Sequence, residues 1–266
     1  MHSNTKILLI YTGGTIGMQK DFETGALKAF NFSKLLQRVP ELKLLDCAIE
    51  TISFENPIDS SNISPKSWVA IAEVIEQNYT AFDGFVVLHG SDTMSYSASA
   101  LSFMLENLGK PVIFTGSQLP IGDLRTDAKE NLITAIQIAS LQENGKPVIT
   151  EVGLYFEYKL YRGNRTTKIS AEHFNAFTSP NYPFLIESGV HLKVNKDLRL
   201  PLDENQPLRV HKVFDNNVVI IKMFPGINQK VLETLVHIPD LKGIGLETYG
   251  SGNAPTEEWF IELLQQ

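Results

Sequence analysis

Four turns rich in glycine and hydroxyl residues are the parts of this sequence whose residue types could do chemistry. They occupy residues 12–15, 90–93, 115–117 and 249–253, and each follows a short run of apolar residues. Glycine lets the backbone N–H groups of a turn come close to a ligand, and the hydroxyl groups add further hydrogen-bonding atoms. If these turns lie together in the fold, they would form a polar binding surface for a small ligand.

Each turn also has a simpler interpretation as a tight turn that leads into a helix cap. Ser91 and Asp92 precede a helical pattern that starts near Met94, so we expect them to cap that helix. Ser117 and Ser251, taken alone, fit an ordinary turn better than a catalytic role. Capping and catalysis are compatible at Asp92, because a carboxylate has several acceptor positions.

Most known catalytic signatures are absent from the sequence. It contains neither a Gly-x-Ser-x-Gly elbow nor a His-Glu-x-x-His pair, and its six histidines lack the spacing of metal ligands, so we predict no metal site. His89 directly follows an apolar run, and we expect it to be a packed, hydrogen-bonded residue. The glycines at residues 13–17 lack the Gly-Lys-Ser/Thr ending of a phosphate-binding loop.

The hydroxyl groups of these turns remain as candidate nucleophiles, and a hydroxyl nucleophile needs a base. Thr15 lies on a glycine turn, but a threonine hydroxyl is a weak nucleophile on its own. Lys168 is a candidate base: burial would favour its neutral form, whereas a neighbouring Asp92 would favour the ammonium ion. A solvated surface lysine is the alternative, and the sequence leaves this choice open.

The elements that must position these residues follow from the apolar pattern. Apolar runs predict strands at residues 7–11, 84–88 and 111–114, and amphipathic stretches predict helices at residues 68–77, 94–108 and 131–141. Strand, turn and helix in this order predict an α/β fold with a mostly parallel sheet and helices on both faces. Ligands of such sheets bind at the carboxyl ends of the strands, which is where the turns lie.

A polar, proline-bearing stretch at residues 196–208 predicts an interdomain linker. We therefore predict a large N-terminal domain, residues 1–195, which carries the catalytic residues, and a smaller α/β domain at residues 209–266. In the smaller domain we expect strands at residues 217–224 and 243–249 and helices at residues 228–236 and 256–264, with Thr256 as an N-cap. Two strands are few for an α/β layer, so this domain is expected to be incomplete.

Composition excludes several classes of partner. Of 266 residues, 23 are Lys or Arg and 30 are Asp or Glu, which gives a net charge of −7. This acidic balance argues against nucleic acid and against an anionic membrane surface as partners. The single cysteine, Cys47, has no partner for an internal disulfide, and no apolar run approaches the ~18 residues of a membrane span. We therefore expect a cytoplasmic protein.

Two motifs together resemble the bacterial L-asparaginase family. One is Thr-Gly-Gly-Thr-Ile-Gly at residues 12–17, and the other is His-Gly-Ser-Asp-Thr-Met at residues 89–94. Residues 101–113, 115–118 and 160–168 are similar to the cytoplasmic type I branch in particular. The resemblance covers essentially the whole chain. It implies hydrolysis of L-asparagine to L-aspartate and ammonia through an acyl-enzyme ester, weaker action on L-glutamine, no cofactor, and a homodimer or a dimer of dimers.

The resemblance assigns catalytic roles to four residues. Thr15 matches the threonine that attacks the side-chain amide of the substrate. Ser91, Asp92 and Lys168 match a group that activates the nucleophile or relays protons. Asp92 also matches the carboxylate that binds the substrate's α-ammonium, and Ser91 is expected to contact the substrate too. Position 91 is serine where the family usually has threonine, which preserves the hydroxyl.

The resemblance implies further contacts outside this group. Ser60 and Ser61 match the segment that binds the substrate's α-carboxylate, and Asn253 matches an asparagine that supports the active site of a neighbouring subunit. The family's mobile-loop tyrosine has no match, because Ala26 stands at the equivalent position. Family members continue well past the position of Gln266, so we expect the chain to be truncated.

Two other interpretations stay open. One is the related subunit of a tRNA-dependent amidotransferase, which would be expected to carry an extra N-terminal domain; the motif at residues 12–15 lies too near the start for one. The other is a non-catalytic domain that uses the same pocket to sense an amino acid.

Overall fold

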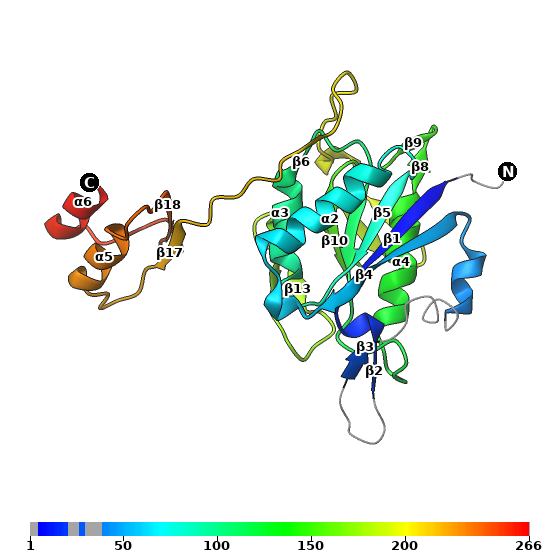
Figure 1. Ribbon diagram of the computed structural model, residues 1–266, viewed down its shortest axis with the longest axis horizontal. Helices are drawn as coiled ribbons and strands as arrows, with labels where there is room; N and C mark the ends of the chain where they lie inside the picture. The colour runs from blue at the N-terminus through cyan, green and yellow to red at the C-terminus, as the bar shows by residue number, and fades with distance from the viewer. Residues whose placement is uncertain (1–4, 21–26, 30–38, 266) are drawn as a thin grey trace. The chain divides into compact units, whose positions relative to one another are not determined.

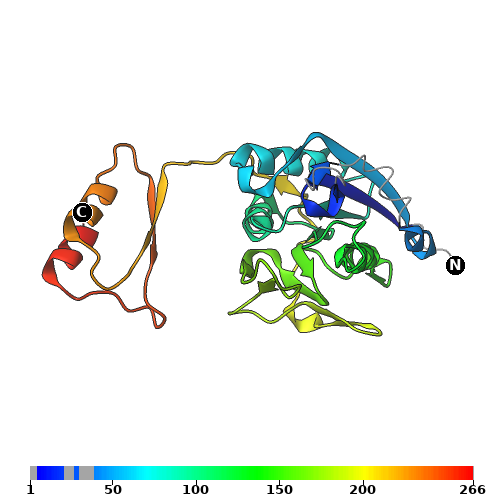
Figure 2. The same cartoon turned by 90° about the horizontal axis from the view of Figure 1, so that it is seen from below.

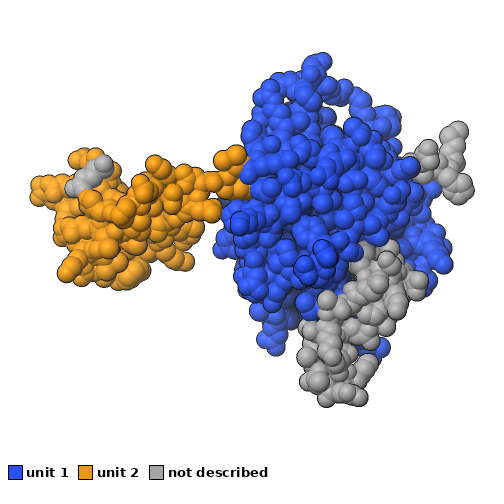
Figure 3. Space-filling model, viewed as in Figure 1, with its two compact units in different colours: residues 1–212 blue, residues 213–266 orange. Residues whose placement is uncertain are grey.

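The computed structural model describes residues 5–20, 27–29 and 39–265 of the chain. These residues divide into two compact units, Met1–Lys212 and Val213–Gln266 (Figure 3). Each unit has its own hydrophobic core and is described by itself.

The first unit is built on an eight-stranded sheet. Its strands are β1 (Lys6–Gly13), β4 (Ala48–Ile58), β5 (Gly84–Leu88), β7 (Val112–Thr115), β10 (Val152–Phe156), β11 (Lys159–Arg162), β14 (Ile186–Ser188) and β15 (Leu192–Val194). The spatial order is β15-β14-β11-β10-β7-β5-β1-β4. Strands β4, β1, β5, β7 and β10 are parallel, and β11, β14 and β15 extend the sheet antiparallel. The predicted α/β class with a mostly parallel sheet is confirmed.

Helices cover both faces of this sheet (Figures 1 and 2). Helices α2 (Pro65–Asn78) and α3 (Met94–Met104) pack on one face, and α4 (Ala128–Ser140) packs on the other. Successive residues of a strand point to opposite faces, so Leu8 and Ile10 of β1 join the core under α2 and α3, while Ile7 and Leu9 join the core under α4. This is why the strand is an unbroken apolar run.

Helix α3 ends four residues earlier than the sequence pattern predicts. Leu105–Glu106 leaves the helix as the short strand β6, which pairs with β16 (Arg209–Val210). Asn107 then adopts a positive φ of 56°, a conformation that asparagine tolerates better than most residues. The apolar residues after Met104 still pack in the hydrophobic core, but they are not part of the helix.

Short elements complete the first unit. The paired strands are β2 (Met18–Lys20) with β3 (Leu27–Ala29), β8 (Gln142–Glu143) with β9 (Lys146–Pro147), and β12 (Thr167–Lys168) with β13 (Phe177–Thr178). The 3-10 turns are η1 (Thr15–Gly17), η2 (Pro40–Leu44), η3 (Ser60–Asn62), η4 (Gly163–Arg165) and η5 (Lys196–Leu198).

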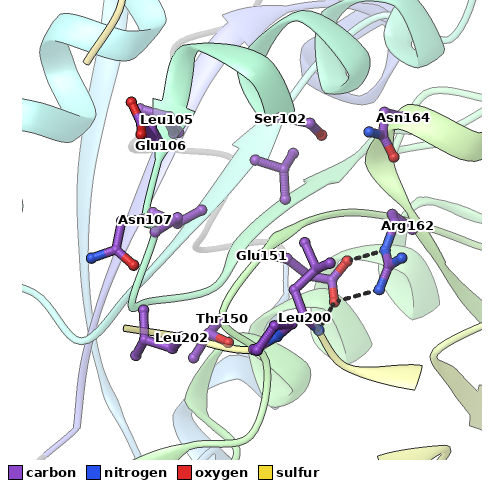
Figure 4. Close-up of a pocket in the computed structure, with 13 residues that line it drawn as sticks. Ser102, Leu105, Glu106, Asn107, Thr150, Glu151, Arg162, Asn164, Leu200 and Leu202 are labelled. Atoms are coloured by element: carbon purple, nitrogen blue, oxygen red, sulfur yellow. Dashed lines mark hydrogen bonds and ion pairs between the residues drawn. The ribbon is translucent and has the colours of Figure 1, made fainter. Parts of the chain in front are cut away.

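Residues 196–208, which the sequence analysis predicts to be a linker, contact the first unit. Arg162 Nη2 donates a hydrogen bond to Leu198 O at 2.6 Å, and Leu200 N donates one to Glu151 Oε1 at 3.2 Å. Glu151 and Arg162 form a buried ion pair at the wall of a pocket of about 170 Å³ (Figure 4). In the structure this segment therefore belongs to the first compact unit.

The second unit pairs two parallel strands with two helices. Its elements are β17 (Val218–Lys222), α5 (Gln229–Val236), β18 (Gly243–Glu247) and α6 (Glu258–Leu264), close to the predicted ranges. Its core includes Ile221, Leu232 and Phe260. The predicted N-cap at Thr256 is wrong: α6 begins at Glu258, so Glu257 holds the cap position.

Candidate active site

The carboxyl ends of β1, β5 and β7 bring three of the four predicted turns together. Tyr11 of β1 is level with Leu88 of β5, and Leu88 is level with Thr115 of β7. The turns that follow these residues therefore leave the sheet along one edge, as the strand pattern predicts. The end of β4 reaches the same edge beside β1. The fourth turn follows β18 in the second unit.

Glycines let the turns pack closely against one another. Gly14 has a φ of +89°, and a Cβ added to it would lie 2.5 Å from Gly90 N. A Cβ at Gly90 would lie 2.6 Å from Ser60 Oγ, and one at Gly116 would lie 2.3 Å from His89 O. Distances this short are closer than any side-chain carbon tolerates, so the arrangement of the turns requires glycine at these positions.

We expect Gly14→Ala to destabilise the protein more than Gly145→Ala does. Both glycines have positive φ, +89° and +77°, so alanine is strained at either position. Gly14 also has a ψ of 167°, a combination that essentially only glycine adopts, so backbone strain there costs about 1–3 kcal/mol. An added Cβ at Gly145 meets nothing within 4 Å, whereas one at Gly14 overlaps the backbone of the Gly90 turn. That overlap should cost a further ~1–3 kcal/mol. Urea unfolding measures both losses, and equal values would contradict the close contact.

The two threonines of the first turn differ in burial. The Thr12 hydroxyl is buried and donates a hydrogen bond to Leu88 O at 2.8 Å, which ties β1 to β5. Thr15 begins η1 and is half-buried. Among the described residues, the structure gives no hydrogen bond to the Thr15 hydroxyl. Of the two threonines in the motif, only Thr15 has a hydroxyl that is available to a ligand.

Lys168 lies between Ser91 and Asp92. Its Nζ donates hydrogen bonds to Ser91 Oγ at 2.8 Å and to Asp92 Oδ1 at 2.6 Å. The lysine side chain is 15% exposed and the Asp92 side chain 66% exposed. Lys168 is therefore not a solvated surface lysine. The strand β12 carries it to the turn after β5 from a distant part of the chain.

The prediction that Ser91 and Asp92 cap the following helix is wrong. Thr93 holds the cap position of α3, and no side chain makes a cap hydrogen bond there. The Thr93 hydroxyl instead donates to Ser60 O at 2.7 Å, which joins this turn to the end of β4. The side chains of Ser91 and Asp92 are both engaged by Lys168, a contact that a local sequence pattern does not reveal.

The two serines after β4 differ in their surroundings. Ser60 is buried next to the Gly90 turn. Ser61 is exposed, and its N–H and hydroxyl donate to Asp59 Oδ1 at 3.0 and 2.9 Å. These two hydrogen bonds lower the pKa of the Asp59 carboxyl group. Ser60 thus lies at the edge of the sheet with the other predicted residues, while the Ser61 hydroxyl is already bound by its neighbour.

His89 is a packed, hydrogen-bonded residue, as predicted. Trp68 Nε1 donates to Ser97 Oγ at 2.9 Å, Ser97 Oγ lies 2.8 Å from His89 Nε2, and His89 Nδ1 lies 2.7 Å from Gly90 O. Trp68 can only donate and a carbonyl can only accept, so the Ser97 hydroxyl donates to Nε2 and the imidazole carries its proton on Nδ1. Burial lowers the pKa of His89 from 6.5 to about 4.

We expect His89 to make the protein less stable as the pH falls from about 6.5 to about 4. In this range the imidazole takes up a proton in the unfolded chain but stays neutral in the folded one, so acid favours unfolding. The loss amounts to about 3 kcal/mol, and above pH 6.5 the full stability is present. Urea unfolding at several pH values should show a flatter profile for His89→Asn and no change for the exposed His191→Asn. A His89→Asn profile as steep as the wild type would contradict the prediction.

Gln118 is a residue near this group to which the sequence analysis gives no role. The Ser91 hydroxyl donates to Gln118 Oε1 at 3.3 Å, and Gln118 Nε2 donates to His173 O at 3.0 Å. Its sequence signals are its place directly after the third turn and its inclusion in the segment 115–118 that is similar to the type I branch. A contact with the Ser91 turn and with the segment after Lys168 depends on the tertiary fold.

Two predicted features belong to the second unit or lie outside the described residues. Asn253 is an exposed residue of the second unit, where its backbone carbonyl accepts a hydrogen bond from Tyr249 N at 2.9 Å. Ala26, the position expected to carry the family's mobile-loop tyrosine, lies outside the described residues.

Metal-binding and membrane-spanning features are absent from the described part of the chain. In it, no group of three or more His, Cys, Asp or Glu side chains could hold a metal ion. None of the helices placed by the structure is long and apolar enough to cross a membrane.

Comparisons with known proteins identify the family of this chain. The family model described as "Asparaginase, N-terminal" matches residues 6–200. The chain is 43% identical over 261 residues to "L-asparaginase 1" of Escherichia coli K12, which covers 98% of this chain and 75% of that protein. It is 34% identical to a subunit of the glutamyl-tRNA(Gln) amidotransferase of Pyrococcus abyssi, over 95% of this chain and 58% of the other.

A solved structure is similar over the same range. The crystal structure of L-asparaginase I from Vibrio cholerae matches with a TM-score of 0.88 and 37% identity, and the match covers 99% of this chain and 77% of that one. The family model matches well over half of the chain, and the Escherichia coli relative is well above 30% identical. This chain belongs to the asparaginase family.

Proposed function

We propose that this chain hydrolyses the side-chain amide of L-asparagine to give L-aspartate and ammonia, with weaker action on L-glutamine. The observation that carries the proposal is the contact of Lys168 with both Ser91 and Asp92, at the edge of the sheet where the Thr15 turn also lies. The similarity to L-asparaginase 1 supports the choice of substrate.

In the proposed reaction the Thr15 hydroxyl oxygen attacks the carbon of the substrate's side-chain amide. A C–O bond forms as the hydroxyl proton passes to a base, and the C–N bond breaks as the nitrogen takes up a proton and leaves as ammonia. Water then attacks the acyl-enzyme ester, which releases L-aspartate and returns a proton to the Thr15 oxygen. Backbone N–H groups of the glycine turns stabilise the oxyanion of each step, at roughly 3 kcal/mol per donor.

Lys168 is the proposed proton acceptor, and Ser91 connects it to the reacting groups. The lysine is 15% exposed, and its Nζ lies 2.8 Å from Ser91 Oγ. An ammonium ion cannot accept a proton, so Lys168 has to be neutral when Thr15 attacks. The substrate's own α-ammonium favours that state, because it competes with Lys168 for the Asp92 carboxylate.

The two charged groups of the substrate have matching partners in the proposal. Lys168 binds Asp92 through Oδ1, and two-thirds of the Asp92 side chain is exposed, so the carboxylate has room to bind an ammonium group as well. Ser60 and Ser61 are proposed to bind the α-carboxylate. Ser61 has to turn its hydroxyl away from Asp59 to do so.

A neighbouring subunit is also part of the proposal. Asn253 is exposed in the second unit, and we propose that it supports the active site of another copy of the chain. The active protein is then a homodimer or a dimer of dimers. Analytical ultracentrifugation measures the mass directly.

Replacing Lys168 with methionine tests the proposed function. We expect the wild-type chain to release ammonia from L-asparagine faster than from L-glutamine. Lys168→Met should lower kcat on L-asparagine by about 10²–10⁴, the range typical of a lost acid–base group. Lys168→Arg should be similarly impaired, because a guanidinium does not give up its proton in a protein. Ammonia release is followed by a coupled assay.

Lys146→Met is the matched control, since Lys146 is a surface lysine whose side chain is 68% exposed. Its rate should equal the wild-type rate. If Lys168→Arg kept the wild-type rate, the lysine would act only as a positive charge and the proposed base would be wrong. If the wild-type chain bound the amino acid but released no ammonia, the sensor interpretation would replace the enzyme.

A further inference from the structure

We propose that His89 is a positioning residue that holds the peptide between Gly90 and Ser91 in one orientation, with its carbonyl against the buried imidazole and its N–H available to the substrate. The Ser91 N–H then donates to the oxyanion that forms when Thr15 attacks the amide carbon. This inference rests on the proposed function, and it gives His89 a role that involves no transfer of its own proton.

The hydrogen bonds of the imidazole exclude His89 as the base that activates Thr15. The Ser97 hydroxyl donates to Nε2 at 2.8 Å, and Nδ1 donates to Gly90 O at 2.7 Å. A neutral imidazole has one ring lone pair that accepts, and Ser97 already occupies it. The histidine is 1% exposed and packs against Phe114, with the ring centroids 5.9 Å apart. Its polar contact with the turn after β5 is therefore the one to the Gly90 carbonyl.

This contact fixes the direction of the Ser91 N–H. None of the described peptide bonds is cis, so the Gly90 carbonyl and the Ser91 N–H point in opposite directions. Because the carbonyl is directed at the buried ring of His89, the N–H points away from that ring. Among the described residues, the structure gives no hydrogen bond from Ser91 N. This N–H is therefore a donor that a ligand can use.

The neighbours of the peptide place it in the candidate active site. Lys168 Nζ donates to Ser91 Oγ at 2.8 Å, so the residue that carries the N–H also contacts the proposed base. A Cβ added to Gly14 would lie 2.5 Å from Gly90 N, so the first turn lies directly against the same turn. Thr15 follows Gly14 in that first turn. The Ser91 N–H is thus close to both groups that react in the proposed mechanism.

Glycine at position 90 explains why the peptide needs a partner that holds it. A Cβ at Gly90 would lie 2.6 Å from Ser60 Oγ, so the close packing of the turns favours glycine there. Glycine also permits many backbone conformations, so the peptide that follows it rotates more easily than one that follows another residue. A rotated peptide would direct the Gly90 carbonyl toward the site, where its partial negative charge would repel the oxyanion. The hydrogen bond from His89 opposes this rotation.

Two helices determine which nitrogen of His89 carries the proton. Trp68 of α2 donates to Ser97 Oγ at 2.9 Å, and the Ser97 hydroxyl of α3 then donates to Nε2. The proton of the neutral ring therefore lies on Nδ1, which faces Gly90 O. The donor that holds the carbonyl is in this way set before any substrate binds.

Three substitutions of His89 separate its two hydrogen bonds. Asparagine carries its amide nitrogen on Cγ, as histidine carries Nδ1, so His89→Asn keeps a donor for Gly90 O. Glutamine places its amide one bond further out, where Nε2 lies, so His89→Gln keeps a partner for Ser97 and loses the contact with Gly90. His89→Leu branches at Cγ like asparagine but has no hydrogen-bonding atom. Comparison of Asn with Leu therefore isolates the hydrogen bond to the carbonyl.

His89→Gln and His89→Leu should lower kcat on L-asparagine by at least about fivefold, the effect of one hydrogen bond, and by at most about 10³, the effect of losing one oxyanion donor. KM should change little, because the oxyanion is absent from the bound substrate. His89→Asn should recover most of the wild-type kcat, and a purely structural role would not produce this rescue. His191→Leu, at an exposed histidine, is the control and should leave both constants unchanged.

Crystal structures of the same variants test the orientation of the peptide without turnover. The Gly90 carbonyl should be directed at residue 89 in the wild type and in His89→Asn. In His89→Gln and His89→Leu it should be rotated or present in two orientations. If the wild-type chain releases no ammonia, the proposed function fails, and these structures still decide whether His89 holds the peptide.

A loss of kcat in Gln and Leu that is recovered in Asn, together with the change in the carbonyl, supports the inference. Equal losses in all three variants, a wild-type kcat in Gln and Leu, or a rise in KM alone would overturn it. An unchanged carbonyl in both Gln and Leu would overturn it as well. Thermal unfolding shows that each variant is folded before it is assayed. If His89→Leu does not fold, the comparison of Gln with Asn decides.

Discussion

Thr15→Ala should reduce the kcat of L-asparagine hydrolysis by about 10⁴ or more. The proposed mechanism forms its covalent ester on the Thr15 oxygen, and losses of this size are typical when a nucleophile is removed. The residue is half-buried and its hydroxyl has no hydrogen bond among the described residues, so the substitution removes little structure. Ammonia release under single-turnover and steady-state conditions measures the effect. Thermal unfolding should differ little from the wild type.

Thr12 provides a matched control within the same motif. Its hydroxyl is buried and donates to Leu88 O at 2.8 Å, so Thr12→Val keeps the shape but loses one hydrogen bond. We expect Thr12→Val to cost about 1 kcal/mol of stability and to change kcat by less than tenfold. Thr15→Ser, which keeps a hydroxyl, should retain measurable hydrolysis. If Thr15→Ala hydrolysed L-asparagine within tenfold of the wild type, Thr15 would not be the nucleophile.

Arg162→Met should lower the free energy of unfolding by about 3–5 kcal/mol. Arg162 Nε lies 2.6 Å from Glu151 Oε2, and the side chains of the pair are only 10% and 3% exposed (Figure 4). Removing the guanidinium leaves a buried carboxylate without its counter-charge, which is the most costly way to break such a pair. It also takes a hydrogen bond from Leu198 O. Urea unfolding measures the loss.

Two further variants show whether the ion pair is the cause. In Arg162→Met with Glu151→Met the unpaired charge is gone, so most of the lost stability should return. The surface pair of Lys146 and Glu204, whose side chains are 68% and 64% exposed, is the control. Lys146→Met should cost less than about 1 kcal/mol. A loss in Arg162→Met as small as the surface value would contradict the assignment.

The strands around the site could be predicted because their sequence signal is local. β1 and β5 are covered by helices on both faces, so residues 7–11 of β1 and all of β5 form continuous apolar runs that stand out in the sequence. Parallel strands place their carboxyl ends at one edge of the sheet, so the turns after β1, β5 and β7 could be expected to meet. The position of Thr15 beside the Ser91 turn follows from this topology.

Three features that the sequence analysis missed depend on contacts between distant segments. Thr93 donates its hydroxyl to Ser60 O, 33 residues away, and this competes with an ordinary helix cap. Gln118 reaches His173 O, 55 residues away. The 196–208 segment is polar like a linker, but the buried carboxylate of Glu151 binds Leu200 N, 49 residues away. A pattern read over a few residues carries no information about such partners.

The backbone contacts among the turns limit how the substrate preference of this protein can be engineered. Gly14 and Gly116 lie against the backbone of neighbouring turns and Gly90 lies against Ser60, so even one extra carbon at these positions should destabilise the fold. The part of the site that can vary is the one to which Ser91 and Gln118 contribute side chains rather than backbone. Selection for hydrolysis of other amides should therefore accumulate substitutions around Gln118 and in the loop between β12 and β13, and leave the glycines unchanged.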